Sequence, residues 1–256
     1  MSYQVSSVAM VTGASSGIGA ALARRLATEG RDLVLVGRRA DRLRTAVPGA
    51  AEPELLAVDL AVPDGVAAVA DRLAAAERPV DLLIHAAGLT TALPFGVAAL
   101  DDELAQLQVN VVATTQLLHA AMTAMQARGG GQIVVVGSTA AHWSSGSYAA
   151  SKAWLEVLAG ALADRTPTTD VQVLVVRPGF TRTDLHERAG IDNSGVPGWM
   201  WLAADRVAAE TLSALRAGRR SWTPTRRYRA LVAATAPLPR HRRSAVLRRL
   251  APLRPR

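Results

Sequence analysis

The sequence lacks cysteine altogether and contains a single lysine among its 256 residues. Without cysteine there is no disulfide framework and no thiolate chemistry, and we expect no metal site. No apolar run is close to the length of about 20 residues that a helix needs to cross a membrane. The first ten residues also lack the charged start of a secretory signal. These absences predict a cytoplasmic protein.

Acidic residues are missing from the last part of the chain. After Glu210 there are 13 arginines and no acid, whereas residues 1–210 hold 16 basic and 21 acidic groups. The formal net charge of +8 is therefore concentrated in a basic tail. Body and tail are expected to face different partners.

Half of the residues are hydrophobic, and Val- and Leu-rich runs alternate with longer amphipathic stretches. Such runs, each ending in a turn-forming residue, are typical of parallel strands buried on both faces. The expected strands are 7–13, 32–38, 54–60, 80–88, 131–138 and 171–179, and the expected helices are 18–29, 40–47, 63–76, 101–128 and 148–164. The alternation predicts an α/β fold of the Rossmann type, a doubly wound parallel sheet with helices on both faces. We expect one domain over residues 1–222 and a basic helical extension over 223–256.

A glycine-rich turn, TGASSGIG, joins the first strand to the first helix. Gly13 permits the tight turn, Gly17 lets the backbone approach a pyrophosphate, and Gly19 allows the helix to pack closely on the strand. The N-terminus of the helix then offers free N–H groups and a positive dipole end to phosphates. An ordinary tight connection is the alternative, but a strand before and a helix after the turn favour dinucleotide binding.

The end of the second strand indicates which nicotinamide cofactor is bound. Sites for NAD commonly place an acid there to hold the ribose 2′-hydroxyl. This chain has Gly37 at that place, followed by Arg38 and Arg39. A guanidinium suits a 2′-phosphate, so NADP is favoured, with Arg38 the stronger candidate.

The only lysine follows a tyrosine at helical spacing. Tyr148 and Lys152 are i and i+4 on a helix that begins near Ser147, so they project from one face. Ser138 ends the preceding strand, where ligands bind in open α/β sheets. A preference for arginine explains the other 28 basic positions but not this exception, so position 152 is expected to require an ammonium group.

With these residues the sequence closely resembles the short-chain dehydrogenase/reductase family, in its NADP-preferring type with a Tyr-x-x-x-Lys motif. The resemblance covers residues 8 to about 223. Besides the glycine-rich turn, the matching residues are Asp59, Leu60, Ala87, Gly88, Asn110, Ser138, Tyr148, Lys152 and the segment RPGFTRT at 177–183.

The resemblance implies a role for each catalytic residue. Tyr148 is expected to protonate a carbonyl oxygen, with Lys152 lowering its pKa and binding the nicotinamide ribose. Lysine can pass on a proton, whereas arginine is effectively never deprotonated. Asn110 is expected to hold a relay water, and Ser138 to polarise the carbonyl. Each of these residues could instead be structural, as a cap, a turn residue or a packed aromatic.

The resemblance also implies the cofactor-binding set, in which Thr183 binds the carboxamide. The expected residues are Gly13, Ser15, Ser16, Gly17, Ile18, Gly19, Arg38, Arg39, Asp59, Leu60, Ala87, Gly88, Tyr148, Lys152, Pro178, Gly179, Thr181 and Thr183.

The chain departs from the family pattern at two places. Many relatives have an asparagine before the Ala-Gly that ends the fourth strand, whereas this chain has His85-Ala86-Ala87-Gly88. One polar contact near the cofactor is therefore expected to be missing or moved to His85, and His85 is expected to be structural. Ser138 and Tyr148 are ten residues apart, about three fewer than usual in the family. Ser144 or Ser145 could therefore share or replace the role of Ser138.

The segment 184–207, called the lid below, contains three glycines and the sequence Trp199-Met200-Trp201. Mobile glycines beside apolar bulk are typical of a loop that closes over a substrate, and the bulk favours an apolar substrate. Alternatively, the tryptophans pack the lid on the body. His142 and Trp143 could line the same pocket.

These features predict an NADPH-dependent oxidoreductase that reversibly reduces a ketone or aldehyde, with a lipid-like or 3-oxoacyl substrate favoured. The alternative of another class is a non-catalytic NADP(H)-binding regulator, which would be expected to lose Tyr148 or Lys152. Nucleic-acid binding is not expected because the tail has little aromatic interleaving. The resemblance implies a homodimer or homotetramer.

The tail combines apolar stripes with arginine-rich faces. One stripe holds Tyr228, Leu231 and Val232, and a second holds Val246, Leu247 and Leu250. Such helices can lie on an anionic bilayer, so we expect peripheral association with the inner membrane surface. The alternatives are that the stripes pack on the body or a neighbouring subunit, or that the arginines attract an acidic carrier.

Overall fold

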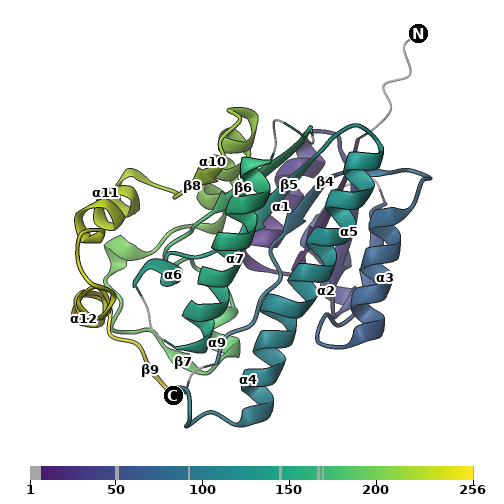
Figure 1. Ribbon diagram of the computed structural model, residues 1–256. Coiled ribbons are helices and arrows are strands. Elements are labelled where there is room, and N and C mark those ends of the chain that lie inside the picture. The colour runs from purple at the N-terminus through teal and green to yellow at the C-terminus, as the bar shows by residue number, and fades with distance from the viewer. Residues whose placement is uncertain are drawn as a thin grey trace.

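The computed structural model describes residues 7–49, 52–91, 93–143, 146–165, 168 and 170–255 (Figure 1). A seven-stranded sheet has the order β3-β2-β1-β4-β5-β6-β8, and each paired strand runs parallel to its neighbours. Its strands are β1 (Val8–Thr12), β2 (Asp32–Gly37), β3 (Glu54–Ala57), β4 (Val80–His85), β5 (Gly131–Val136), β6 (Val171–Val176) and β8 (Ser221–Trp222). The order reverses between β1 and β4, which confirms the predicted doubly wound sheet.

Helices cover both faces of this sheet, as its apolar strands require. Val8 and Met10 face a core cluster shared with α3 (Pro63–Ala74), α5 (Thr114–Ala127) and α7 (Ser147–Asp164). Ala9 and Val11 point the other way, into a cluster shared with α1 (Gly17–Thr28), α2 (Ala40–Ala46) and α10 (Ala204–Arg216). The alternation along one strand thus supplies both halves of the core.

The expected helix over 101–128 is interrupted. It consists of α4 (Leu100–Leu107), a π-helical segment (Gln108–Ala113) and α5. The Thr114 hydroxyl donates to the Val109 carbonyl at 3.2 Å, so a side chain bonds a backbone acceptor inside the widened turn. The π-helical segment carries Asn110, and such segments often occur at functional sites.

The lid and the tail lie together at one end of the sheet (Figure 1). The lid contains α9 (Leu185–Arg188), β7 (Ile191–Asp192) and a 3₁₀ turn (Gly198–Met200). The tail forms α11 (Arg226–Thr235), α12 (Arg240–Leu250) and β9 (Arg254–Pro255), and β9 pairs antiparallel with β7. Residues 223–255 are called the C-terminal hairpin below. It packs against α6 (Ala140–Trp143), the short helix that follows Ser138.

The apolar stripes of the hairpin face the body of the protein. Tyr228 is 2% exposed and packs with Trp143, with Leu231 and Val232 against the same cluster. Leu247 and Leu250 pack against the cluster that contains Met200. These five side chains therefore pack on the body, as the alternative predicted, and do not form a free apolar surface for a membrane. Within the described part of the chain, no helix has the length and hydropathy of a membrane span.

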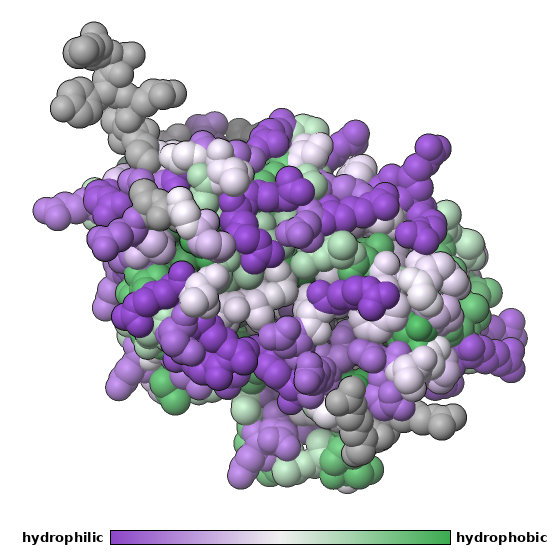
Figure 2. All heavy atoms as spheres, turned by 180° about the vertical axis from the view of Figure 1, so that it is seen from behind, coloured by the Kyte–Doolittle hydropathy of each residue, from purple (hydrophilic) through white to green (hydrophobic). Residues whose placement is uncertain are grey.

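The face opposite to that of Figure 1 is mostly hydrophilic (Figure 2). Apolar side chains form smaller patches on it. Exposed ion pairs such as Arg24–Asp205, at 3.4 Å, connect α1 to α10. Pairs of this kind contribute little to stability because water screens them.

Candidate active site

A cleft of about 530 Å³ lies above the carboxyl ends of the strands. It brings together all the predicted site residues except Arg39 and Asn110. Those lining it are Gly13, Ser15, Ser16, Gly17, Ile18, Gly19, Arg38, Asp59, Leu60, Ala87, Gly88, Ser138, Tyr148, Lys152, Pro178, Gly179, Thr181 and Thr183. Residues from seven separate segments thus meet in one cleft.

The glycine-rich turn packs so closely on its neighbours that a larger residue would not fit at three of its positions. Gly13 and Gly17 have φ of +67° and +57°, which favours glycine. A Cβ on Gly13 would lie 2.9 Å from the Ala87 nitrogen, and one on Gly17 would lie 2.8 Å from Thr183 Cγ2. A Cβ on Gly19 would overlap the Gly13 carbonyl oxygen. The turn therefore requires glycine at these three positions, and all three line the cleft, as a dinucleotide site requires.

The end of β2 fits a second phosphate. Gly37 offers no carboxylate, and a Cβ built on it would lie 3.6 Å from the Ser15 hydroxyl oxygen. Arg38 lines the cleft beside Ser15, whereas Arg39 is absent from the lining and precedes α2 as its N-cap. A guanidinium and a hydroxyl are suitable groups for a 2′-phosphate. Of the two predicted arginines, Arg38 is the one placed to meet it.

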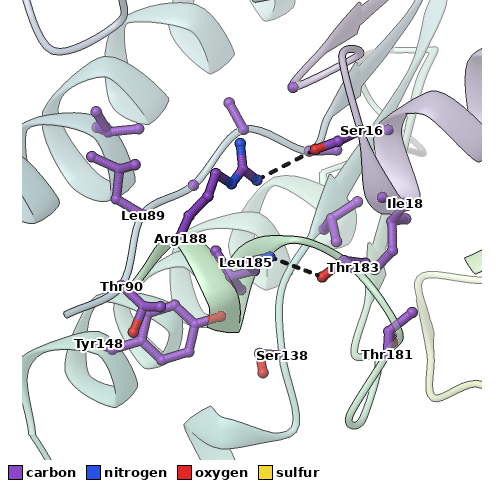
Figure 3. Close-up of a pocket in the computed structure, with 18 of the residues that line it drawn as sticks. Ser16, Ile18, Leu89, Thr90, Ser138, Tyr148, Thr181, Thr183, Leu185 and Arg188 are labelled. Atoms are coloured by element: carbon purple, nitrogen blue, oxygen red, sulfur yellow. Dashed lines mark hydrogen bonds between the residues drawn. The ribbon is translucent and has the colours of Figure 1, made fainter. Parts of the chain in front are cut away.

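The lid is docked on the glycine-rich turn (Figure 3). The Arg188 guanidinium donates to the Ser16 hydroxyl at 3.3 Å, and the Leu185 N–H donates to the Thr183 hydroxyl at 3.4 Å. Arg42 pairs with Asp184 at 3.6 Å, which ties the base of the lid to α2. Sequence reasoning missed Arg188, since nothing in the sequence distinguishes it from the other arginines.

Tyr148 and Ser138 lie on the opposite side of the pocket from Ser16 (Figure 3). Burial raises the pKa of the Tyr148 phenol above its usual value, and the nearby Ser138 hydroxyl opposes that rise. The Ala140 N–H donates to the Ser138 hydroxyl oxygen at 3.1 Å. The Ser138 hydroxyl oxygen therefore already accepts one hydrogen bond from the start of α6.

Lys152 lies one turn after Tyr148 and is buried. Its ammonium donates to the Val136 carbonyl at 3.2 Å and lies 5.9 Å from the centre of the Tyr148 ring. Burial lowers the pKa of Lys152 to about 8, while the Glu156 carboxylate acts in the opposite direction. Lys152 was expected to lower the pKa of Tyr148. The pKa of Tyr148 is instead raised, because burial outweighs the other effects on the phenol.

Glu156 lies one helical turn beyond Lys152 and is held by Arg177 at 3.1 Å. Burial raises the pKa of this carboxyl, while the charges of Arg177 and Lys152 lower it. A buried charge requires such partners. The carboxylate therefore links the catalytic helix to the arginine that precedes Pro178.

Asn110 lies behind the cleft lining, where it supports the residues that form it. Its amide oxygen accepts from the Leu89 N–H at 2.8 Å, and its amide nitrogen donates to the Leu89 carbonyl at 2.8 Å and to Ser151 at 3.1 Å. A Cβ on Gly88 would lie 3.3 Å from both the Asn110 oxygen and the Lys152 nitrogen. Asn110 therefore fixes the segment after β4 beside Lys152.

His85 is structural, as expected. Thr12 accepts from the Ala86 and Ala87 N–H groups at 3.2 and 3.1 Å and contacts His85 Nδ1 at 3.1 Å. Since the Thr12 oxygen already accepts twice, its hydrogen is donated to Nδ1, and Nε2–H donates to Thr114 at 2.8 Å. Burial, with the Lys152 charge, lowers the pKa of His85 to about 3, so the ring is neutral. The ring thus joins Thr12 at the end of β1 to Thr114 at the start of α5.

The substrate side of the cleft is not lined by Trp199-Met200-Trp201 of the lid, as had been expected. The lining includes Trp143, Leu185 and Ile191, together with Leu247 and Leu253 from the C-terminal hairpin. By contrast, Met200 is buried, and the Trp201 ring packs at a tilt against Phe180 and edge-on against His186, with ring centres 5.8 Å apart in both pairs. Met200 and Trp201 therefore pack on the body, as the alternative predicted, whereas Trp199 is 47% exposed. Ser144 and Ser145 lie outside the described residues.

Comparisons with known proteins extend this description. The family model described as short chain dehydrogenase matches residues 7–193. A short chain dehydrogenase of Pseudocercospora fijiensis is 33% identical, with coverage of 69% of this chain and 60% of that protein. Sulfoacetaldehyde reductase 2 of Chromohalobacter salexigens is 32% identical, with coverage of 70% and 75%. The chain thus spans about three fifths of the length of the first of these relatives.

Solved structures agree over most of the chain. A short-chain dehydrogenase from Sphingobium yanoikuyae in complex with NADPH has a TM-score of 0.80 and 31% identity to this chain. The match covers 91% of this chain and 94% of that one. The likeness thus covers more of the chain than the family segment at residues 7–193.

Proposed function

Because the chain belongs to the short-chain dehydrogenase family, we propose that it is an NADP(H)-dependent enzyme that reversibly reduces a ketone or aldehyde to an alcohol. The observation that carries the proposal is the pair of Tyr148 and Lys152, one helical turn apart on α7, in the same cleft as Ser138 and the glycine-rich turn. A non-catalytic NADP(H)-binding protein would have no need of this pair. The catalytic reading is therefore preferred to the regulatory one.

The cofactor supplies a hydride when bound, and residues of the cleft hold it. The backbone at Gly13, Gly17 and Gly19 takes the pyrophosphate, and Arg38 with Ser15 takes the 2′-phosphate. Arg188 adds a guanidinium over the N-terminus of α1, where anions are favoured. Lys152, Tyr148 and Thr183 hold the nicotinamide end. The remaining contacts are assigned to Ser16, Ile18, Asp59, Leu60, Ala87, Gly88, Pro178, Gly179 and Thr181.

Tyr148 donates the proton that converts the reduced carbonyl to an alcohol. The Ser138 hydroxyl donates a hydrogen bond to the carbonyl oxygen and holds it beside the phenol. Lys152 stabilises the phenolate that remains, since a nearby positive charge favours the anionic form. Asn110 fixes the segment beside Lys152 and keeps the relay aligned.

The substrate side favours an apolar carbonyl compound. Its walls are formed by aliphatic and aromatic side chains, among them Leu89, Trp143, Leu185 and Ile191. Burying apolar surface there contributes about 25 cal/mol per Å². A lipid-like or 3-oxoacyl substrate fits these walls better than a charged one.

The protein is also proposed to form a homodimer or homotetramer through α4 and α7. Large apolar side chains are exposed on these helices, with Leu100 at 68%, Leu104 at 52% and Val157 at 75%. An apolar surface of this kind is commonly covered by a partner. A second copy of the chain is the partner that the family implies.

The proposed activity is tested by following NADPH oxidation with ketones and aldehydes of increasing chain length, with NADH in parallel. Wild-type protein is expected to oxidise NADPH faster than NADH in a substrate-dependent manner. The matched control is Tyr148→Phe, which lacks the proton donor and keeps the ring. Equal rates for the two proteins, or NADH preference, would contradict the proposal.

A further inference from the structure

The C-terminal hairpin packs against and hydrogen-bonds the short helix α6 that follows Ser138. Trp143, at the end of α6, is 3% exposed. Its indole N–H donates to the Thr235 hydroxyl of α11 at 2.8 Å, and its carbonyl accepts from the Ser244 hydroxyl of α12 at 2.6 Å. Both helices of the hairpin therefore hold one residue that lines the cleft.

The same hairpin also holds the segment after β6 and the lid. The Tyr228 hydroxyl donates to the Met200 carbonyl at 2.7 Å and accepts from the Phe180 N–H at 3.0 Å. A Cβ on Gly179 would overlap the Tyr228 ring, so this close approach requires glycine. Arg240 donates to the Ala141 carbonyl at 2.9 Å. The hairpin is thus a fixed part of the site's surroundings.

Two side chains of the hairpin reach the cleft itself. Leu247 and Leu253 line it together with Tyr148, Leu185 and Ile191. Leu247 also packs against both apolar clusters of this region, the one around Trp143 and the one around Met200. On α12 it follows the buried Ser244 by three residues and precedes the buried Ala251 by four, so it lies on the inward face of the helix.

We propose that the C-terminal hairpin forms the outer wall of the substrate chamber, and that Leu247 limits the length of the apolar chain attached to the reacting carbonyl. The proposal rests on the proposed function and assigns to the tail a role in selectivity. The pairing of β9 with β7 joins this wall to the lid. The arginines of α12 then occupy the solvent side of the wall, where Arg242, Arg248 and Arg249 are exposed.

The proposal is tested with Leu247→Ala and Leu247→Trp, assayed against a homologous series of 2-alkanones. Leu247→Ala enlarges the chamber and is expected to move the optimum of kcat/KM to longer ketones. Leu247→Trp is expected to lower kcat/KM for long ketones by about tenfold or more, the size of effect that a few methylenes produce in an apolar pocket. Short ketones should be affected little by either change.

The matched control is Arg248→Ala, an exposed neighbour on the same helix, which is expected to leave the chain-length profile unchanged. The melting temperature shows whether each variant is folded, and the dissociation constant for NADPH shows whether it binds the cofactor. Folded variants with the wild-type chain-length profile would overturn the proposal. So would an equal change for every ketone.

A second measurement separates this proposal from the proposed function. Titration calorimetry of the same 2-alkanones into protein saturated with NADP⁺ measures chain-length preference without turnover. If no ketone is reduced but the Leu247 variants bind ketones of a different preferred length, the role of the hairpin is supported and the proposed reductase activity is contradicted. If ketones are reduced and the Leu247 variants keep the wild-type chain-length preference in both binding and kinetics, the reductase activity is supported and the role of the hairpin is contradicted.

Discussion

At the scale of single residues, the charge of Lys152 depends on a carboxylate one turn away. Burial lowers the pKa of Lys152 to about 8, and Glu156 raises it. Reduction consumes a proton through Tyr148 with Lys152 charged. The rate of ketone reduction should therefore decline as the pH rises through about 8, where the ammonium loses its proton.

Replacing Glu156 with Gln should move that decline to lower pH. The amide keeps the shape of the side chain but removes the negative charge that favours the ammonium, so the pKa of Lys152 falls further. The pH profile of kcat/KM for reduction measures this shift. A profile that is unchanged, or displaced to higher pH, would show that Glu156 does not act on Lys152.

Lys152→Arg should abolish most of the turnover although the positive charge is kept. Arginine is effectively never deprotonated and is broader than an ammonium, so it neither passes on a proton nor fits beside the Val136 carbonyl. The measurement is kcat together with the melting temperature. Near wild-type kcat would show that position 152 has no need of lysine.

Arg38→Ala should weaken NADPH binding by one to two orders of magnitude, which corresponds to the ~1.5–3 kcal/mol of a hydrogen bond to a charged group. NADH binding should hardly change, because NADH has no 2′-phosphate. Equilibrium titration by cofactor fluorescence gives both constants. Arg39→Ala is the control and should leave both unchanged, and a larger effect at Arg39 would reverse the assignment.

At the scale of elements, the lid and the glycine-rich turn are connected by Arg188. Arg188→Ala should weaken NADPH and NADH to a similar extent if the guanidinium meets the pyrophosphate at α1, in contrast to the selective effect of Arg38. Arg182→Ala is the control, since Arg182 lies 5.5 Å over the Trp201 ring and is absent from the cleft lining. Cofactor affinity that is insensitive to Arg188→Ala contradicts this role.

Some of the helices, strands and turns could be predicted from sequence patterns and others could not. The strands and the glycine-rich turn were predictable because buried parallel strands require continuous apolar runs, and the turn requires glycine at fixed places. The π-helical segment at Gln108–Ala113 was not, because no periodicity marks one widened turn. The apolar stripe of α12 was recognised, but a stripe has the same pattern whether it covers a lipid surface or Trp143. Long-range contacts decide between the two.

At the scale of the whole molecule, the exposed apolar side chains of α4 and α7 predict an oligomer. Val157→Arg places a charge on the most exposed of them and should yield monomers in light scattering coupled to size-exclusion chromatography. Wild-type protein should elute as a dimer or tetramer. The control is Arg165→Ala just beyond the end of α7, which should keep the wild-type mass. A monomeric wild-type protein would contradict the prediction.

The most direct test of the whole account is hydride transfer itself. Wild-type protein is incubated with NADPH carrying deuterium at the transferable position and with an apolar ketone, and the alcohol is analysed by mass spectrometry. The account predicts one deuterium on the carbinol carbon with the wild-type protein, and almost no labelled alcohol with Tyr148→Phe. NADPH binding without labelled alcohol from any ketone or aldehyde would contradict it and identify the protein as a non-catalytic binder of the cofactor.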